Sequence, residues 1–214
     1  MKYVITAILI GLGLAISVPM VAHSATISNT DTTINFKGEI ISGDAKRLEA
    51  LILRTGIKTV EFDSNGGMAI EGYTLGYVIR RNEVKTVVID GSVCLSACAV
   101  AYIGGVDLEL DGVLGFHVAW SPVDDQSYSD GMKSGQLYSI VGAAYHFNMG
   151  YTNQMSYIIS QVTDSKTFLI LSLDDLKLFT MVDKDFTEYK ELPKHWVYER
   201  IADPLRMYML KGGY

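Results

Sequence analysis

Cysteine is scarce in this chain, and clusters of positive charge are missing. Cys94 and Cys98 are the only cysteines among 214 residues, and no histidines stand near them at the spacing of a zinc site. The residues therefore predict no metal and no cofactor. No run of Lys or Arg stands out in a chain whose net charge is −6. Because phosphate binding needs a basic face, this argues against a nucleic-acid partner.

Long apolar runs are confined to the start of the chain. Residues 4–21 form one such run after a single lysine, and Ala22-His23-Ser24 places small residues three and one positions before a cut ahead of Ala25. This pattern predicts a secretory signal over residues 1–24 and a periplasmic or secreted protein. The alternative is an uncleaved anchor, because a spanning helix needs about 18 apolar residues. No later stretch predicts a membrane span.

Internal repeats and low-complexity tracts are also absent. A composition of 49% hydrophobic and 20% charged residues is typical of a globular protein, and the length suits one domain. We expect a single domain over residues 25–214. Its core should cover about residues 34–182, followed by a tail at residues 183–214 that shows no clear pattern.

Strand and helix patterns alternate through the first half of the chain. β-Branched runs predict strands at residues 34–41, 59–63, 85–90 and 113–120. Apolar spacings of three to four predict helices at residues 43–56, 68–81 and 96–103. This order predicts an α/β fold of right-handed crossovers around a mostly parallel sheet. The rest should be mainly helical, at residues 136–149, 153–162 and from 172, with a loose segment at 26–33 and a polar loop at 121–135.

Three short segments that follow or end predicted strands carry the residues suited to chemistry. They are DSNGG at residues 63–67, CLSAC at 94–98 and LGFH at 114–117. Functional sites of open parallel sheets assemble at the carboxyl ends of the strands. Ser96 stands where a strand turns into a helix, so its hydroxyl lies at the positive end of that helix. Serine needs a base to take its proton, and His117 is the candidate.

Ordinary structural roles remain open for these residues. A serine at the start of a helix is usually an N-cap, and a histidine in a strand is usually structural. Gly66 and Gly67 are compatible with a plain turn. They equally allow backbone N–H groups to approach a ligand, since no Cβ stands in the way.

Taken together, the three segments resemble the ClpP/crotonase superfamily. They are most similar to exported ClpP-like proteins of bacteria, which carry a Cys-x-Ser-Ala-Cys element, and the resemblance spans roughly residues 34–182. It implies a spiral of βαβ units, Ser96 as nucleophile and His117 as general base, with the Gly67 and Ala97 amides as the oxyanion hole. The implied function is an exported serine hydrolase that cleaves peptides or unfolded proteins. The resemblance is also compatible with a homo-oligomer.

The chain also departs from this family. The triad acid of the Clp peptidases matches Phe168, which cannot serve, so Asp164, the nearest upstream acid, becomes the candidate. The missing acid favours a catalytically inactive binding or scaffolding protein as the main alternative. A Ser–Lys enzyme related to signal-peptide peptidases would need Lys133 near Ser96. An acyl-CoA enzyme of the crotonase type conflicts with export, because coenzyme A is cytoplasmic.

The two cysteines flank Ser96 symmetrically. Export would place them in an oxidising compartment, where disulfides persist. Cα atoms four residues apart on a helix are about 6 Å apart, which suits a disulfide, but the Cβ directions of a regular helix do not. We therefore expect a Cys94–Cys98 disulfide, with Cys94 in the turn before the helix. Two buried free thiols are the alternative.

Overall fold

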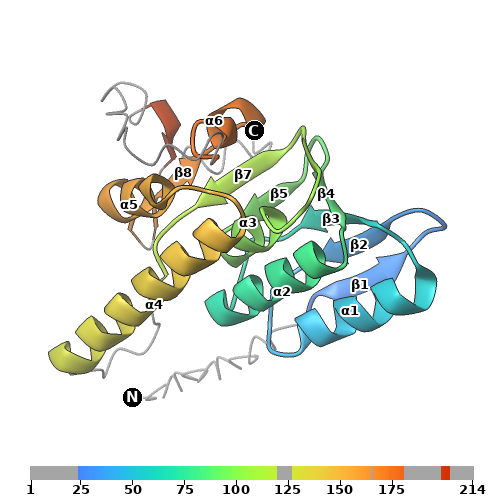
Figure 1. The fold of residues 1–214 in the computed structure, drawn as a ribbon, viewed down its shortest axis with the longest axis horizontal. Helices are drawn as coiled ribbons and strands as arrows, with labels where there is room; N and C mark the ends of the chain where they lie inside the picture. Colours follow the sequence, from blue (N-terminus) through green and yellow to red (C-terminus); the bar gives the residue numbers. More distant parts are fainter. Residues whose placement is uncertain (1–23, 120–126, 165, 181–198, 203–214) are drawn as a thin grey trace, which may run out of the picture.

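The computed structural model describes residues 24–119, 127–164, 166–180 and 199–202 (Figure 1). Apart from residue 24, the predicted signal segment lies outside these residues, as does most of the predicted tail. The described strands form two sheets. One has the order β1-β2-β3-β4-β6, made of Thr26–Asn29, Ile34–Lys37, Thr59–Asp63, Lys85–Val88 and Leu108–Leu110. The other has the order β5-β7-β8-β9, made of Val93–Leu95, Val113–Phe116, Phe168–Ile170 and Ile201–Ala202.

Six helices of the described chain accompany these sheets. They are α1 (Asp44–Thr55), α2 (Ala69–Arg81), α3 (Ala97–Tyr102), α4 (Tyr128–Asn148), α5 (Asn153–Val162) and α6 (Leu173–Lys177). Helix α2 packs against both α1 and α3, and α4 packs against α5. Figure 1 shows α1 and α2 side by side along the five-stranded sheet, while one end of α4 reaches away from the rest of the fold.

The predicted fold class is confirmed. Strands β2, β3, β4 and β6 are parallel neighbours, and α1 and α2 are the crossovers between β2, β3 and β4. Alternation explains β3, where Val60 and Phe62 point into the core and their neighbours are half-buried. Gly56 ends α1 as expected, because its φ of 72° is left-handed and suits glycine.

Several local predictions were wrong. Residues 26–29 are not loose but form β1, which pairs antiparallel with β2 and so gains backbone hydrogen bonds that a polar sequence does not announce. Part of the predicted polar loop is helical, because α4 begins at Tyr128 with Ser127 as its N-cap. The short strands β5, β6 and β8 were not predicted, since three residues carry too little periodicity to recognise.

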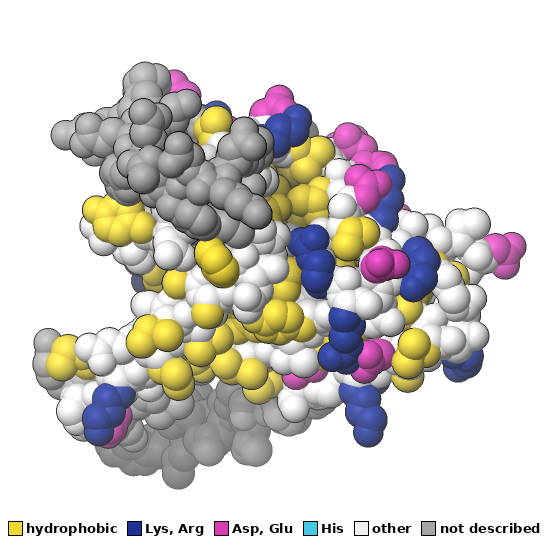
Figure 2. Space-filling view, viewed as in Figure 1, with side chains coloured by type: hydrophobic (Ala, Val, Ile, Leu, Met, Phe, Trp, Pro, Cys, Tyr) yellow, Lys and Arg dark blue, Asp and Glu magenta, His cyan; other side chains and the backbone are white. Residues whose placement is uncertain are grey.

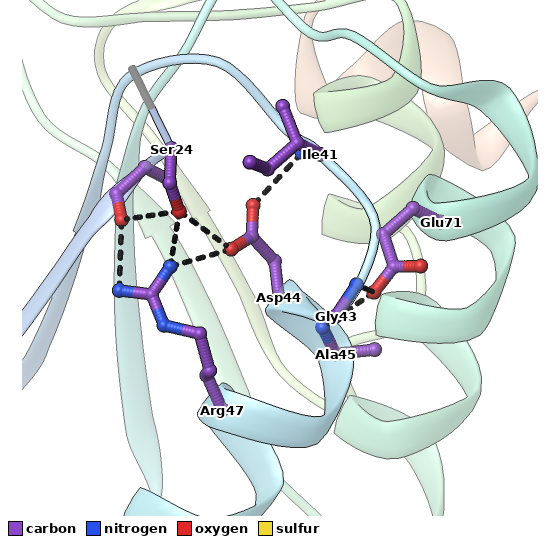
Figure 3. A network of polar contacts seen from close by, with 8 residues as sticks. Ser24, Ile41, Gly43, Asp44, Ala45, Arg47 and Glu71 are labelled. Carbon is purple, nitrogen blue, oxygen red and sulfur yellow. Dashed lines mark hydrogen bonds and ion pairs between the residues drawn. The ribbon is translucent and has the colours of Figure 1, made fainter. Parts of the chain in front are cut away.

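A polar network around the buried Asp44 fixes the start of α1 (Figure 3). The Asp44 carboxylate, fully buried, accepts hydrogen bonds from the Ile41 amide at 2.9 Å and the Ser24 hydroxyl at 3.1 Å, and pairs with Arg47 at 2.7 Å. Arg47 also donates to the Ala25 carbonyl at 3.1 Å. Residues 24 and 25 are thereby held against the first helix.

Helix α4 exposes apolar side chains over much of its length. Met132, Leu137 and Ile140 are 50%, 58% and 68% exposed. Figure 2 shows hydrophobic side chains over the side of the molecule from which α4 extends. Among the described helices, none combines the length and apolar character that crossing a membrane requires.

Candidate active site

Ser96 lies in the sharp turn between β5 and α3. Its amide donates to the Gly115 carbonyl of the neighbouring strand β7 at 2.8 Å, which holds the turn against the sheet. Its backbone has φ 56° and ψ −123°, a conformation that non-glycine residues rarely adopt. Such strain is concentrated at functional sites and directs a nucleophile out of a strand–turn–helix junction.

A disulfide closes this turn. Cys94 in β5 and Cys98 in α3 are bonded, their Cα atoms are 5.1 Å apart, and both residues are completely buried. The predicted pairing is confirmed, but Cys94 lies in a strand rather than in a turn. Because the strand precedes the helix directly, the Cβ atoms face each other as they cannot within a regular helix.

The glycine pair at residues 66–67 approaches Ser96 closely. A Cβ on Gly66 would lie 2.7 Å from the Ser96 Cβ, and the Gly66 φ of 97° also favours glycine. The Gly66 amide bonds the buried Ser64 hydroxyl at 3.0 Å, which fixes the turn. The amides of Gly67 and Ala97 donate no hydrogen bond within the described chain. Neither predicted oxyanion donor is therefore engaged by another group of the described chain.

His117 follows strand β7 and reaches Ser96. Its Nε2 lies 2.6 Å from the Ser96 Oγ, so the structure brings the predicted nucleophile and base together. Its Nδ1 lies 3.2 Å from the main-chain oxygen of Asp164. Since a carbonyl oxygen only accepts, Nδ1 carries the proton there and Nε2 keeps the lone pair that accepts from the Ser96 hydroxyl.

Burial favours a neutral imidazole at His117. Burial lowers the pKa of His117 below its usual 6.5, while the hydrogen bond to the Asp164 backbone and the nearby Asp164 charge oppose the shift. A neutral histidine is the form that can take a proton from serine.

The Asp164 carboxylate does not contact His117. Its Oδ1 accepts from the amides of Lys166 and Thr167 at 2.7 and 2.8 Å and from the Thr167 hydroxyl at 3.0 Å. These bonds hold the carboxylate in its own loop and lower the Asp164 pKa. Asp164, the expected third member, therefore lies next to His117, but it contacts the histidine with its main-chain oxygen and not with its side-chain carboxylate. No sequence signal identifies a main-chain contact of this kind.

Phe168 packs against the ring of the base. Its ring packs on the His117 ring with the centroids 4.6 Å apart and the planes tilted by 42°. Phe168 is the residue that the family resemblance matches to the triad acid. Lys133, the alternative base, is an exposed residue of α4, and the Ser96 hydroxyl bonds His117 instead.

Two cavities are lined by residues of these segments. One, of about 390 Å³, lies against the Gly66-Gly67 turn and includes Lys37, Glu39 and Asp63. The other, of about 610 Å³, borders His117 and is walled by residues of α2 to α5. In the part of the chain that the structure describes, no group of three His, Cys, Asp or Glu side chains could hold a metal ion.

The fold that carries this site is similar to folds among solved structures. A mutant of ClpP1 from Listeria monocytogenes superposes with a TM-score of 0.52, at 16% identity over 71% of this chain and 89% of that one. The chain has a ClpP-like fold. A mutant of 1510-N, a membrane-bound stomatin-specific protease, superposes on this ClpP-like chain with a TM-score of 0.50, at 10% identity over 71% and 76%. No family model and no curated protein sequence matches the chain.

Proposed function

We propose that this ClpP-like chain is a serine hydrolase, with Ser96 as nucleophile and His117 as general base. The observation that carries the proposal is the 2.6 Å contact between the Ser96 Oγ and the His117 Nε2, made by a serine with a strained, positive φ. A structural N-cap serine does not need this backbone conformation, because Ncap residues usually lie in the β region. A purely structural histidine does not need its lone pair directed at a serine.

The proposed reaction uses Ser96, His117 and three main-chain groups near them. His117 takes the Ser96 proton as the oxygen attacks a carbonyl, and later returns it to the leaving group. The amides of Gly67 and Ala97 stabilise the negative charge that develops on the carbonyl oxygen. The main-chain oxygen of Asp164 keeps the proton on Nδ1 and so maintains the productive tautomer. The Asp164 carboxylate, which was the expected third member, has no direct part.

The proposed substrates are peptides or unfolded proteins. One of the two compared structures is of a protein named as a protease, which favours an amide over an ester. One cavity is lined by His117 and another by Gly67, which offers space for a peptide near both proposed groups. Exposed apolar residues on α4 support self-association, which sedimentation velocity would test.

Export is part of the proposal. The Cys94–Cys98 disulfide is compatible with an oxidising compartment. Removal of residues 1–24 would leave Ala25 anchored, because its amide bonds the Glu39 carbonyl at 3.0 Å and its carbonyl bonds Arg47. N-terminal sequencing of protein from a Gram-negative host should begin at Ala25. An intact Met1 in the cytosolic fraction would contradict export.

A second function is favoured by one observation. Among the described residues no carboxylate is hydrogen-bonded to His117, and Phe168, at the sequence position where the family resemblance expects the acid, packs its ring on the His117 ring. A protein that keeps this fold to bind peptides without cleaving them would have no use for the acid. This alternative makes the opposite prediction about the reactivity of Ser96.

Labelling with a fluorophosphonate distinguishes the two functions. An activated serine reacts with the probe, whereas the serines of a scaffold do not. We expect labelling of the folded wild-type protein, with mass spectrometry placing the adduct on Ser96, and none in Ser96→Ala or His117→Ala. The urea-unfolded protein is the control for nonspecific reaction. Absence of labelling, or an adduct on another serine, would contradict the proposal.

A further inference from the structure

The cavity next to His117 has an uncharged but polar wall. Residues from the described chain that line it include no Asp, Glu, Lys or Arg. Tyrosine and serine side chains line it instead, together with His146 on α4. A charged side chain entering this cavity would meet no partner of opposite charge among the described lining residues, which is unfavourable where water is displaced.

One hydrogen-bonded pair in this wall is unusual. The His146 Nδ1 lies 2.6 Å from the Ser156 Oγ of helix α5, and both residues line the cavity. His146 is only 5% exposed, whereas Ser156 is half-buried. Burial lowers the His146 pKa to about 4, so the imidazole is neutral at physiological pH. The serine hydroxyl is the part of this pair that a ligand reaches.

The proton in this pair has no fixed position. The His146 Nε2 is buried and has no hydrogen-bond partner among the described residues, so no group on that side selects the tautomer. If Ser156 donates to Nδ1, its oxygen accepts from a ligand. If Nδ1 donates to Ser156, the hydroxyl donates to a ligand. The pair therefore suits a ligand group that both donates and accepts.

We propose that Ser156 and His146 form a specificity-determining pair that selects substrates with a carboxamide side chain, glutamine or asparagine, next to the cleaved bond. A carboxamide carries an N–H donor and a carbonyl acceptor, so it matches either tautomer of the pair. An aliphatic side chain of the same length leaves the second hydrogen-bonding capacity of the Ser156 hydroxyl unused, and a carboxylate or ammonium brings a charge into an uncharged wall. This inference rests on the proposed hydrolase function.

Fluorogenic peptides that differ only at this residue test the proposal. Acetyl-Ala-Ala-X-aminocoumarins with X as glutamine, norleucine, glutamate or lysine compare the four chemistries. We expect kcat/KM for glutamine to exceed each of the others by about 10- to 100-fold, the effect of one or two hydrogen bonds. Ser156→Ala should remove the preference over norleucine, and Ser156→Thr, which keeps a hydroxyl, should retain most of it.

Ser160 provides the matched control. It lines the same cavity one turn further along α5, but its hydroxyl is bonded to the Tyr157 carbonyl at 2.7 Å. Ser160→Ala should leave the glutamine-to-norleucine ratio unchanged. Equal hydrolysis of glutamine and norleucine peptides, or equal effects of the two alanine variants on their ratio, would overturn the proposal.

A binding measurement separates this proposal from the hydrolase function. Ser96→Ala protein with ¹⁵N-labelled histidine is titrated with acetyl-Ala-Ala-Gln and with its norleucine analogue. We expect the glutamine peptide to bind at least about tenfold more tightly and to shift the His146 side-chain resonances. If the wild type cleaves no peptide and the binding preference for glutamine is still observed, the hydrolase proposal fails and the pair keeps its role in recognition. Equal binding of both peptides overturns the pair's role whether or not the enzyme is active.

Discussion

The Phe168 ring packs against the His117 ring, with 4.6 Å between their centroids, at the sequence position where the family resemblance expects an acid. The Nδ1 of His117 has the main-chain oxygen of Asp164 as its partner, at 3.2 Å. The base is therefore oriented by an aromatic contact and a peptide carbonyl. This arrangement predicts a different response to mutation from that of a Ser–His–Asp triad.

Asp164→Asn should reduce kcat/KM by less than about tenfold, whereas loss of a triad carboxylate costs about 10⁴-fold. The asparagine oxygen can accept the same bonds from Lys166 and Thr167, so the loop and its main-chain contact to His117 persist. Steady-state kinetics on a fluorogenic peptide measures the effect. A loss greater than about 100-fold would show that the carboxylate acts directly on the base.

The pH dependence of activity follows from the lowered pKa of His117. The base works only when neutral, so kcat/KM should be full at neutral pH and fall in acid, with its midpoint below the ordinary value of 6.5. Because the Asp164 charge raises the pKa of His117, Asp164→Asn should move this midpoint further into acid. A pH–rate profile of both proteins checks the shift. A midpoint above 6.5 would contradict a burial-dominated base.

Strain at Ser96 predicts a difference between two inactive variants. Both Ser96→Ala and Ser96→Gly lose the hydroxyl, but only glycine adopts φ 56° and ψ −123° without strain. We expect Ser96→Gly to be more stable than Ser96→Ala by about 1 kcal/mol in denaturant unfolding.

Glu83 is the matched control for this comparison. It is the other described non-glycine residue with a positive φ, at 54°, and it follows the end of α2, remote from the Ser96 turn in sequence. Glu83→Gly should stabilise the protein by a similar amount while leaving hydrolysis unchanged. If Ser96→Gly is no more stable than Ser96→Ala, the turn is not strained.

The disulfide should matter more for reactivity than for stability. It closes a very short loop, so the Cys94→Ala/Cys98→Ala variant should lose at most about 2 kcal/mol of unfolding free energy. Without it the Ser96 turn can relax, and we expect the fluorophosphonate labelling rate to fall about tenfold. A reductant should lower the labelling rate of the wild type in the same way and leave the labelling rate of the double variant unchanged. Labelling that is insensitive to reduction would contradict this role.

His146 predicts an acid-sensitive fold. Its pKa is lowered to about 4 in the folded protein by burial, against 6.5 when unfolded. The folded state therefore binds fewer protons, and its stability is complete above pH 6.5 and declines as the pH falls from 6.5 towards 4. This one residue accounts for about 3 kcal/mol across that range.

A His146→Phe variant isolates this effect. It should reduce the slope of the stability curve between pH 6.5 and 4, measured by urea unfolding, while His117, whose pKa burial also lowers, keeps its contribution. The pKa values of Asp164 and Asp175 are also lowered. Their contributions to the stability of the protein are lost at lower pH, and equally in the wild type and the variant. Parallel curves for the wild type and the variant would show that His146 does not titrate as described.

Much of the fold and of the candidate site could be predicted from local patterns. The β-branched runs of β3 and β4 and the apolar spacing of α1 and α2 determine each element through its own neighbours, and their alternation implies parallel strands. Ser96, His117 and the Cys94–Cys98 pair could be singled out because each follows or ends a predicted strand, and the family resemblance gave Ser96 and His117 their expected roles. The disulfide could be predicted because the two cysteines are only four residues apart and the chain bends between them.

Other features depended on residues far apart in sequence. Strand β1 exists only because β2 supplies its hydrogen-bond partners. His117 meets the Asp164 carbonyl across 47 positions, and main-chain groups carry no residue-specific signal. His146 and Ser156 stand on different helices, so only the packing of α4 against α5 could place them together in one cavity wall. Local periodicity determines which elements form, whereas long-range packing determines which groups they bring into contact.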